Sequence, residues 1–122
     1  MIKAYKIFTG SDGHTHIETG TVKDNILTHA ASIRFKETPA HSVYDWHPAP
    51  TIQYVITLSG TLEFETWLGE KFILNPGEVL IAMDTTGTGH KWRLIDDAPW
   101  RRAYVAFNEN VEVNFIPSGT TM

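Results

Sequence analysis

The sequence predicts an all-β protein, a sandwich or jelly roll built from about nine short strands. Runs rich in Val, Ile, Thr, Tyr, Phe and Trp recur along the chain, and Gly, Pro, Asp and Asn interrupt them at intervals of about 8 to 12 residues. Apolar and polar residues alternate within the clearest runs, which is the period of a strand. No window carries a helical pattern longer than a turn or two. Packing the strands as two sheets protects their exposed edges.

Turn residues at 11–13, 68–70 and 75–77 separate the runs and predict tight connections between neighbouring strands. The expected strands are Ala4–Phe8, His14–Glu18, Ala31–Lys36, Ile52–Leu58, Thr61–Trp67, Lys71–Leu74, Val79–Met83, Lys91–Ile95 and Arg102–Phe107. Residues 61–67 alternate strictly, so we expect one face of that strand to be solvated. In 52–58 both faces carry apolar or weakly polar residues, which indicates a strand covered on both sides.

Composition narrows the class of protein. A chain of 122 residues and 13.7 kDa is the size of one domain, so we expect residues 1–122 to form a single unit. The net charge of −4 and the absence of a basic stripe argue against nucleic acid as a partner. The absence of cysteine excludes disulfides, thiolate zinc sites and cysteine nucleophiles. Without a signal peptide or an apolar run of about 20 residues, we expect a soluble cytoplasmic protein that does not enter membranes.

Two histidines stand where a pocket is expected to open. His47 precedes the run 52–58 and His90 precedes the run 91–95, each after a segment dense in Pro or Gly. Residues an even number of positions apart point to the same face of a strand, which groups His47 with Gln53 and His90 with Trp92. Val55 and Thr57 lie on the same face of their strand as Gln53. These residues are therefore expected to converge in one pocket, with Trp92, Val55 and Thr57 on its wall.

Two stretches resemble the sequence motifs of the cupin superfamily. Residues 47–60 look like the first motif, in which two histidines flank one residue, a glutamate follows and a glycine closes. Residues 69–90 are similar to the second motif, which ends in a histidine. The resemblance implies a small RmlC-like cupin whose core spans approximately 30–107. Its fold would be a jelly-roll barrel of two antiparallel sheets, also called a double-stranded β-helix, with a pocket at one end.

The resemblance also implies a metal site, with His47, Gln53 and His90 at the positions of the first histidine, the glutamate and the last histidine. Ala49 replaces the second histidine, and Gln53 lacks the carboxylate. Such a site takes a divalent ion (Zn, Ni, Cu, Mn or Fe), but an iron oxygenase normally needs two histidines and a carboxylate. The lost charge should cost on the order of a few kcal/mol of metal affinity at an effective dielectric near 20. Asp84 and Asp45 are candidates to restore it.

Three functions remain open, and the sequence does not decide whether the protein is an enzyme. The first is a metal-dependent enzyme acting on a small organic acid, sugar or aromatic molecule. The second is a metal-free module or sensor that binds a small ligand without turning it over. The third is metal-free acid–base catalysis, with His47 or His90 as base and Tyr54 or Tyr104 as acid. Parity disfavours Tyr54, which is expected to point away from the pocket together with Trp46.

Other patterns have simpler interpretations. The spacing of His14 and His16 indicates the exposed shoulder of a hairpin, and residues 84–86 read as a turn capped by Asp84. Residues 87–90 lack the further glycine, the lysine and the helix of a phosphate-binding loop. The apolar face formed by residues 52, 54, 56 and 58 is large enough to predict a homodimer.

Overall fold

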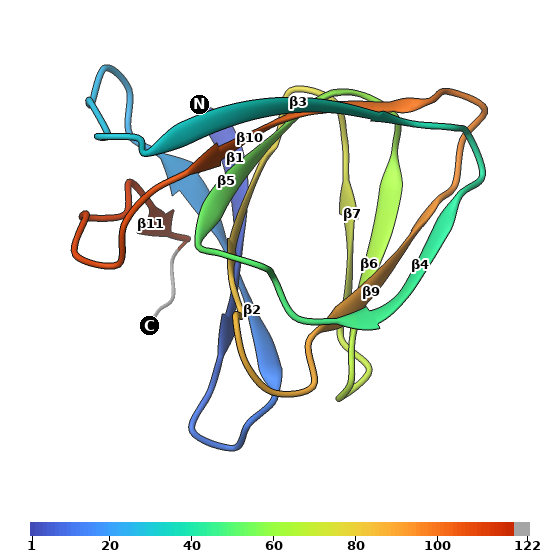
Figure 1. Ribbon diagram of the computed structural model, residues 1–122, viewed down its shortest axis with the longest axis horizontal. Helices are drawn as coiled ribbons and strands as arrows, with labels where there is room; N and C mark the ends of the chain where they lie inside the picture. Colours follow the sequence, from blue (N-terminus) through green and yellow to red (C-terminus); the bar gives the residue numbers. More distant parts are fainter. Residues whose placement is uncertain (119–122) are drawn as a thin grey trace.

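The computed structural model describes residues 1–118, which form eleven strands and no helix (Figure 1). The strands are β1 (Ile2–Thr9), β2 (Thr15–Val22), β3 (Ser32–Thr38), β4 (Val43–His47), β5 (Gln53–Ser59), β6 (Leu62–Thr66), β7 (Lys71–Leu74), β8 (Val79–Met83), β9 (His90–Leu94), β10 (Trp100–Ala106) and β11 (Ile116–Pro117). The expected all-β class is confirmed. Within residues 1–118 there is no helix that could span a membrane.

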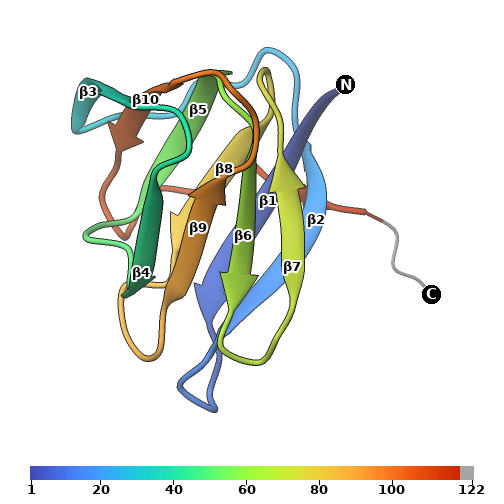
Figure 2. The same ribbon diagram turned by 90° about the vertical axis from the view of Figure 1, so that its right-hand side faces the viewer.

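The strands form two sheets that face each other. The larger sheet has seven strands in the order β11-β2-β1-β8-β5-β10-β3, and the smaller has four in the order β4-β9-β6-β7. Figure 2 shows the smaller sheet in front of the larger one. The sheets share no hydrogen-bonded ladder in the described part of the chain, so the expected barrel is not closed. The expectation of purely antiparallel sheets is also wrong, because β1 runs parallel to β8. No hairpin joins these two strands, so no short turn dictates their relative direction.

The strands from β3 to β10 pair in a nested pattern. Four antiparallel pairs, β3 with β10, β4 with β9, β5 with β8 and β6 with β7, account for all eight. The chain from Ser32 to Ala106 is therefore one long antiparallel ribbon, folded back at the turn between β6 and β7. Two further antiparallel contacts, of β10 with β5 and of β9 with β6, roll this ribbon into two layers.

Aromatic rings fill part of the space between the sheets. The ring of Phe72 on β7 stacks on Tyr5 at 4.4 Å and on Phe64 at 5.1 Å between centroids. Leu62 and Leu74 are fully buried beside them. Alternation along β6 places Leu62 and Phe64 in this core and leaves the glutamates of the strand on the outer face.

A second apolar cluster lies on the outer face of the larger sheet. The segment 107–115 contributes side chains that pack over Tyr54 and Ile81 on that face. The ring of Phe107 lies 4.9 Å from that of Tyr54, so part of the face that predicted a homodimer is covered by the chain itself. Ile56 and Leu58 remain accessible, and the neighbouring edge strand β3 exposes Phe35 to 70%.

Candidate functional site

A pocket of about 490 Å³ opens between the two sheets, lined by residues of β3, β4, β5, β6, β8, β9 and β10. The structure brings His47, Gln53 and His90 together on its wall, from β4, β5 and β9 respectively. Trp92 and Val55 also line it.

Thr57, the third expected wall residue, is not among the residues that line this pocket. Its side chain is buried, and its hydroxyl accepts a hydrogen bond of 3.2 Å from Trp100 Nε1. Thr57 therefore supports the pocket by holding the Trp100 ring in place.

His47 reaches the pocket through an irregularity in β4. The pairing of β4 with β9 shifts register between Tyr44 and His47, so both of these residues line the pocket although three positions separate them. Regular alternation would turn Trp46 inward instead of His47. Trp46 lies outside, where its ring packs against Trp67 at 5.1 Å. The bulge therefore points the imidazole of His47 into the pocket, where the ring stacks on Tyr44 with 4.0 Å between centroids.

The backbone beside His47 requires a glycine at position 89. Gly89 has a φ of 69°, which side-chain-bearing residues rarely adopt. A Cβ there would lie 2.2 Å from the carbonyl oxygen of His47. The close approach lets the strand ends carrying His47 and His90 lie directly opposite each other in the β4–β9 ladder.

A buried carboxyl group holds His90. The ring atom Nδ1 lies 2.6 Å from Asp84 Oδ2, and the hydroxyl of Thr15 donates to the same oxygen at 2.8 Å. Asp84 is 0% exposed and His90 only 5%. The interpretation of Asp84 as a turn cap missed this role, since its side-chain partners, Thr15 and His90, come from two other strands. Its backbone carbonyl also accepts a hydrogen bond from Ala49, which ties the loop after His47 to the same point.

The two imidazoles present the same free nitrogen. His47 Nδ1 donates to the carbonyl oxygen of Asp45 at 2.7 Å, and an ionised Asp84 likewise makes His90 Nδ1 a donor. In the neutral rings Nε2 then carries the lone pair. Burial lowers the pKa of His47 below the usual value for histidine, which favours its neutral form. The ring centroids lie 4.6 Å apart, close enough for one ligand atom or ion to contact both rings.

Gln53 completes this group. It is 5% exposed, and its carboxamide makes no hydrogen bond with any other group of residues 1–118. Its amide atoms are not among the buried side-chain atoms without a partner in residues 1–118, so they are accessible from the pocket. The side chain lines the pocket together with both histidines. The amide is therefore available to a molecule or ion held there.

The donor set fits a divalent ion through neutral ligands. No group of three or more His, Cys, Asp or Glu suitable for a metal ion occurs within residues 1–118. Two imidazole nitrogens and an amide oxygen still suit zinc, copper and nickel. Asp45 does not supply the missing charge, since it is not among the residues that line this pocket. Asp84 instead contacts His90 Nδ1, which is the kind of contact by which carboxylates commonly orient metal-bound histidines.

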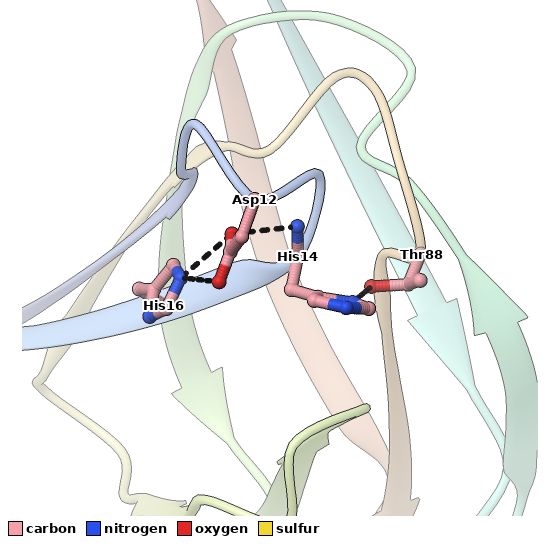
Figure 3. Close-up of polar contacts among 4 residues, drawn as sticks. All are labelled: Asp12, His14, His16 and Thr88. Carbon is pink, nitrogen blue, oxygen red and sulfur yellow. Dashed lines mark hydrogen bonds and ion pairs between the residues drawn. The ribbon is translucent and has the colours of Figure 1, made fainter.

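The hairpin histidines form no comparable group (Figure 3). His16 Nε2 lies 2.9 Å from Asp12 Oδ2, while His14 Nδ1 lies 3.1 Å from Thr88 Oγ1. The two rings thus have separate partners, one within the hairpin and the other on the loop between β8 and β9. These contacts fasten the hairpin between β1 and β2 to the loop that precedes His90.

The two candidate tyrosines lie on opposite faces of the larger sheet. Tyr54 faces the outer cluster, where its hydroxyl accepts a hydrogen bond from the Asn114 amide at 2.9 Å. Tyr104 lines the pocket, and Arg102 Nε donates to its hydroxyl at 3.0 Å. Of the two expected acids, only Tyr104 is in reach of a ligand in this pocket.

Comparison of the chain with models of protein families and with curated proteins finds no match.

Proposed function

We propose that this protein is a small cupin-type jelly roll that holds a divalent metal ion with His47, Gln53 and His90, and that the ion acts on a small organic molecule bound in the pocket. The observation that carries the proposal is that one cavity is lined by two imidazoles whose Nδ1 atoms already have partners and by a carboxamide without a hydrogen bond to residues 1–118.

The strand pairing supports the jelly-roll assignment. Eight strands in two sheets of four, paired first with last, second with second-last and so on, are expected when an antiparallel ribbon rolls up. This ribbon runs from Ser32 to Ala106, close to the core of 30–107 implied by the cupin resemblance. β1, β2 and β11 then extend the larger sheet beyond the rolled ribbon.

The chemistry follows from the ligand set. A bound ion would act as a Lewis acid that polarises an oxygen of the organic molecule. The residues of this chain supply the fixed surroundings: Asp84 sets the tautomer of His90, and the Asp45 carbonyl sets that of His47. With only neutral ligands, the site stays more electron-deficient than one with a carboxylate, so the ion polarises a substrate oxygen more strongly but is held less tightly.

Metal binding is the direct test. Protein purified without chelator and incubated with zinc, nickel, copper or manganese should hold about one equivalent by elemental analysis. His47→Ala and His90→Ala should each abolish it, whereas His29→Ala, which changes an exposed loop histidine, should not. Folded protein that takes up none of these ions would overturn the proposal.

Restoring the missing carboxylate is a second test, in which metal affinity is expected to rise and not to fall. Gln53→Glu should raise metal affinity, by on the order of a few kcal/mol at an effective dielectric near 20. The same variant should be less stable than the wild type without metal, because the new carboxyl group is buried without a partner. A glutamate that destabilises the metal-free protein but leaves metal affinity unchanged would show that Gln53 is not a ligand.

The Asp84–His90 pair favours a second candidate, metal-free acid–base catalysis, with His90 as the base and Tyr104 as the acid across the pocket. A third outcome is a binding module that holds a ligand without turning it over. Activity that survives exhaustive chelation and is lost in Tyr104→Phe would support the second candidate. Ligand binding with neither metal nor turnover would leave the binding module.

A further inference from the structure

We propose that the pocket contains an anion subsite centred on Arg102, and that its ligand is a small organic molecule bearing a carboxylate. This deepens the proposed function by naming the class of molecule that the pocket accepts. It rests on that proposal only for the role of the histidines, because the subsite is defined by other residues.

Arg102 is a buried cation without a counter-ion. It is 2% exposed, and no carboxylate of residues 1–118 forms an ion pair with it. Neutral groups surround it: Nη1 donates to Thr38 Oγ1 at 2.6 Å and to the Trp100 carbonyl at 3.0 Å, and Nε donates to the Tyr104 hydroxyl. The remaining nitrogen, Nη2, makes no hydrogen bond within residues 1–118. A buried guanidinium stays charged and is costly unless it is paired.

The position of Arg102 on its strand directs it to the pocket. Trp100, Arg102 and Tyr104 alternate along β10, and all three line the cavity. The guanidinium carbon lies 3.7 Å from the centre of the Trp100 ring. This stacking and the hydrogen bonds fix the plane of the fork, so the free nitrogen is pre-organised for an acceptor.

The charged residues that line the cavity also favour an anionic ligand. Arg34 and Lys36 on β3 also line it, and the lining found within residues 1–118 includes no Asp or Glu. Both side chains lack a carboxylate partner, although four cations elsewhere in the protein, at positions 6, 71, 93 and 101, have one. A chain with a net charge of −4 therefore leaves three cations facing one cavity. Such a wall attracts and retains anions.

Aromatic rings lie between the guanidinium and the histidines. Trp100, under Arg102, meets Trp92 at 4.9 Å, Trp92 meets Tyr44 at 5.8 Å, and Tyr44 stacks on His47. A molecule that spans the pocket thus meets a cation at one end, an apolar floor in the middle and the histidines at the other end. The free guanidinium nitrogen favours an anionic oxygen such as that of a carboxylate, and the floor favours a flat or apolar body.

Benzoate is the probe for this subsite, and benzamide is its neutral counterpart of the same shape. In metal-free protein, followed by ¹⁵N NMR titration, benzoate should bind and benzamide should bind at least about tenfold more weakly, since charge-assisted hydrogen bonds are worth about 1.5 to 3 kcal/mol. Arg102→Gln should weaken benzoate binding by a similar factor. The exposed double variant Arg34→Gln/Lys36→Gln should weaken it several-fold and should fold normally. Lys23→Gln, which removes an exposed cation outside the pocket, should have no effect.

The outcomes separate this subsite from the metal site. His47→Ala should retain benzoate binding in metal-free protein while losing metal binding. Benzoate binding and metal binding can therefore be tested separately, and either can fail without the other. Inorganic phosphate competing with benzoate on equal terms would show an unselective anion site and overturn the carboxylate assignment. Equal binding of benzoate and benzamide, or loss of benzoate binding in His47→Ala but not in the β3 double variant, would overturn the subsite. If Arg102→Gln does not fold, the β3 double variant and the benzamide comparison still decide.

Discussion

Asp84 offers the sharpest test of how the site is built, because it touches the proposed metal ligand without lining the pocket. Asp84→Asn keeps the size of the side chain but can present an NH2 group to His90 Nδ1. The hydrogen of the neutral imidazole would then move to Nε2, the nitrogen proposed to bind the ion. We therefore expect a positioning effect on metal affinity that exceeds the effect on folding.

The two hydrogen bonds to Asp84 determine the expected losses of metal affinity and of stability. Oδ2 of Asp84 receives both Thr15 Oγ1 at 2.8 Å and His90 Nδ1 at 2.6 Å, in a position that is 0% exposed. Losing the outer-shell partner of a metal-bound histidine typically costs 10- to 100-fold in metal affinity, which is about 1.4 to 2.8 kcal/mol. The matched control is Thr15→Val, which removes the other bond to the same oxygen. It should cost about 1 kcal/mol of stability and leave metal affinity nearly unchanged.

Zinc titration measures the metal affinity, and long-range ¹H–¹⁵N NMR of the His90 ring independently shows which ring nitrogen carries the hydrogen. Wild type and Thr15→Val should show the hydrogen on Nδ1, and Asp84→Asn should show it on Nε2. Thermal unfolding reports whether each variant is folded. If Asp84→Asn is folded, keeps the Nδ1 hydrogen and binds zinc as tightly as wild type, Asp84 does not position His90 for a metal.

Three further outcomes are expected. Because the pKa of His47 is lowered in the fold, the unfolded chain takes up its proton first, so stability should fall as pH drops below about 6.5, and metal affinity should fall further still; His47→Gln should flatten this part of a thermal-unfolding pH profile. Gly89→Ala should lose about 1 to 3 kcal/mol of unfolding free energy, and Gly69→Ala, with a φ of 91° but open space around it, should lose less. Leu58→Glu should convert a dimer to a monomer in light scattering if the accessible part of the apolar face of residues 52–58 is the predicted homodimer contact; equal masses for both proteins would contradict that.

The strand pattern was predictable because it depends on neighbours in sequence. Alternation and turn residues located nine strands, each overlapping one that the structure contains. β4 escaped notice, since residues 43–47 contain no clear alternation and follow a Pro-containing loop. The parallel pairing of β1 with β8 was equally hidden, because it joins segments more than seventy positions apart with no turn to signal it.

The site was predictable only in part, for the same reason. Parity with Gln53 predicts that His47 points inward and Trp46 outward, but parity cannot anticipate the bulge in β4 that produces this arrangement. Nor can it show that Asp84 meets Thr15, 69 positions away. Arg102 did leave a signal: an arginine between Trp100 and Tyr104 at the period of a strand indicates a cation on an apolar face. It was missed because the expected strand began at Arg102, two residues too late.

The two proposals make one joint prediction. A divalent ion at the histidines and the guanidinium of Arg102 would place like charges in one cavity whose described lining includes no carboxylate. A bound carboxylate offsets both, so benzoate and metal should each bind more tightly in the presence of the other. Thermodynamic linkage requires the two gains to be equal, and values of about 5- to 150-fold are typical of coupled sites.

Benzoate titrations of metal-free and zinc-loaded protein, paired with zinc titrations at zero and saturating benzoate, measure both gains in affinity. Arg102→Gln should weaken benzoate binding with and without zinc and reduce the mutual gain, since it removes one of the two charges that the carboxylate offsets. Independent binding, with neither ligand affecting the other, would mean that the two groups do not serve the same bound molecule.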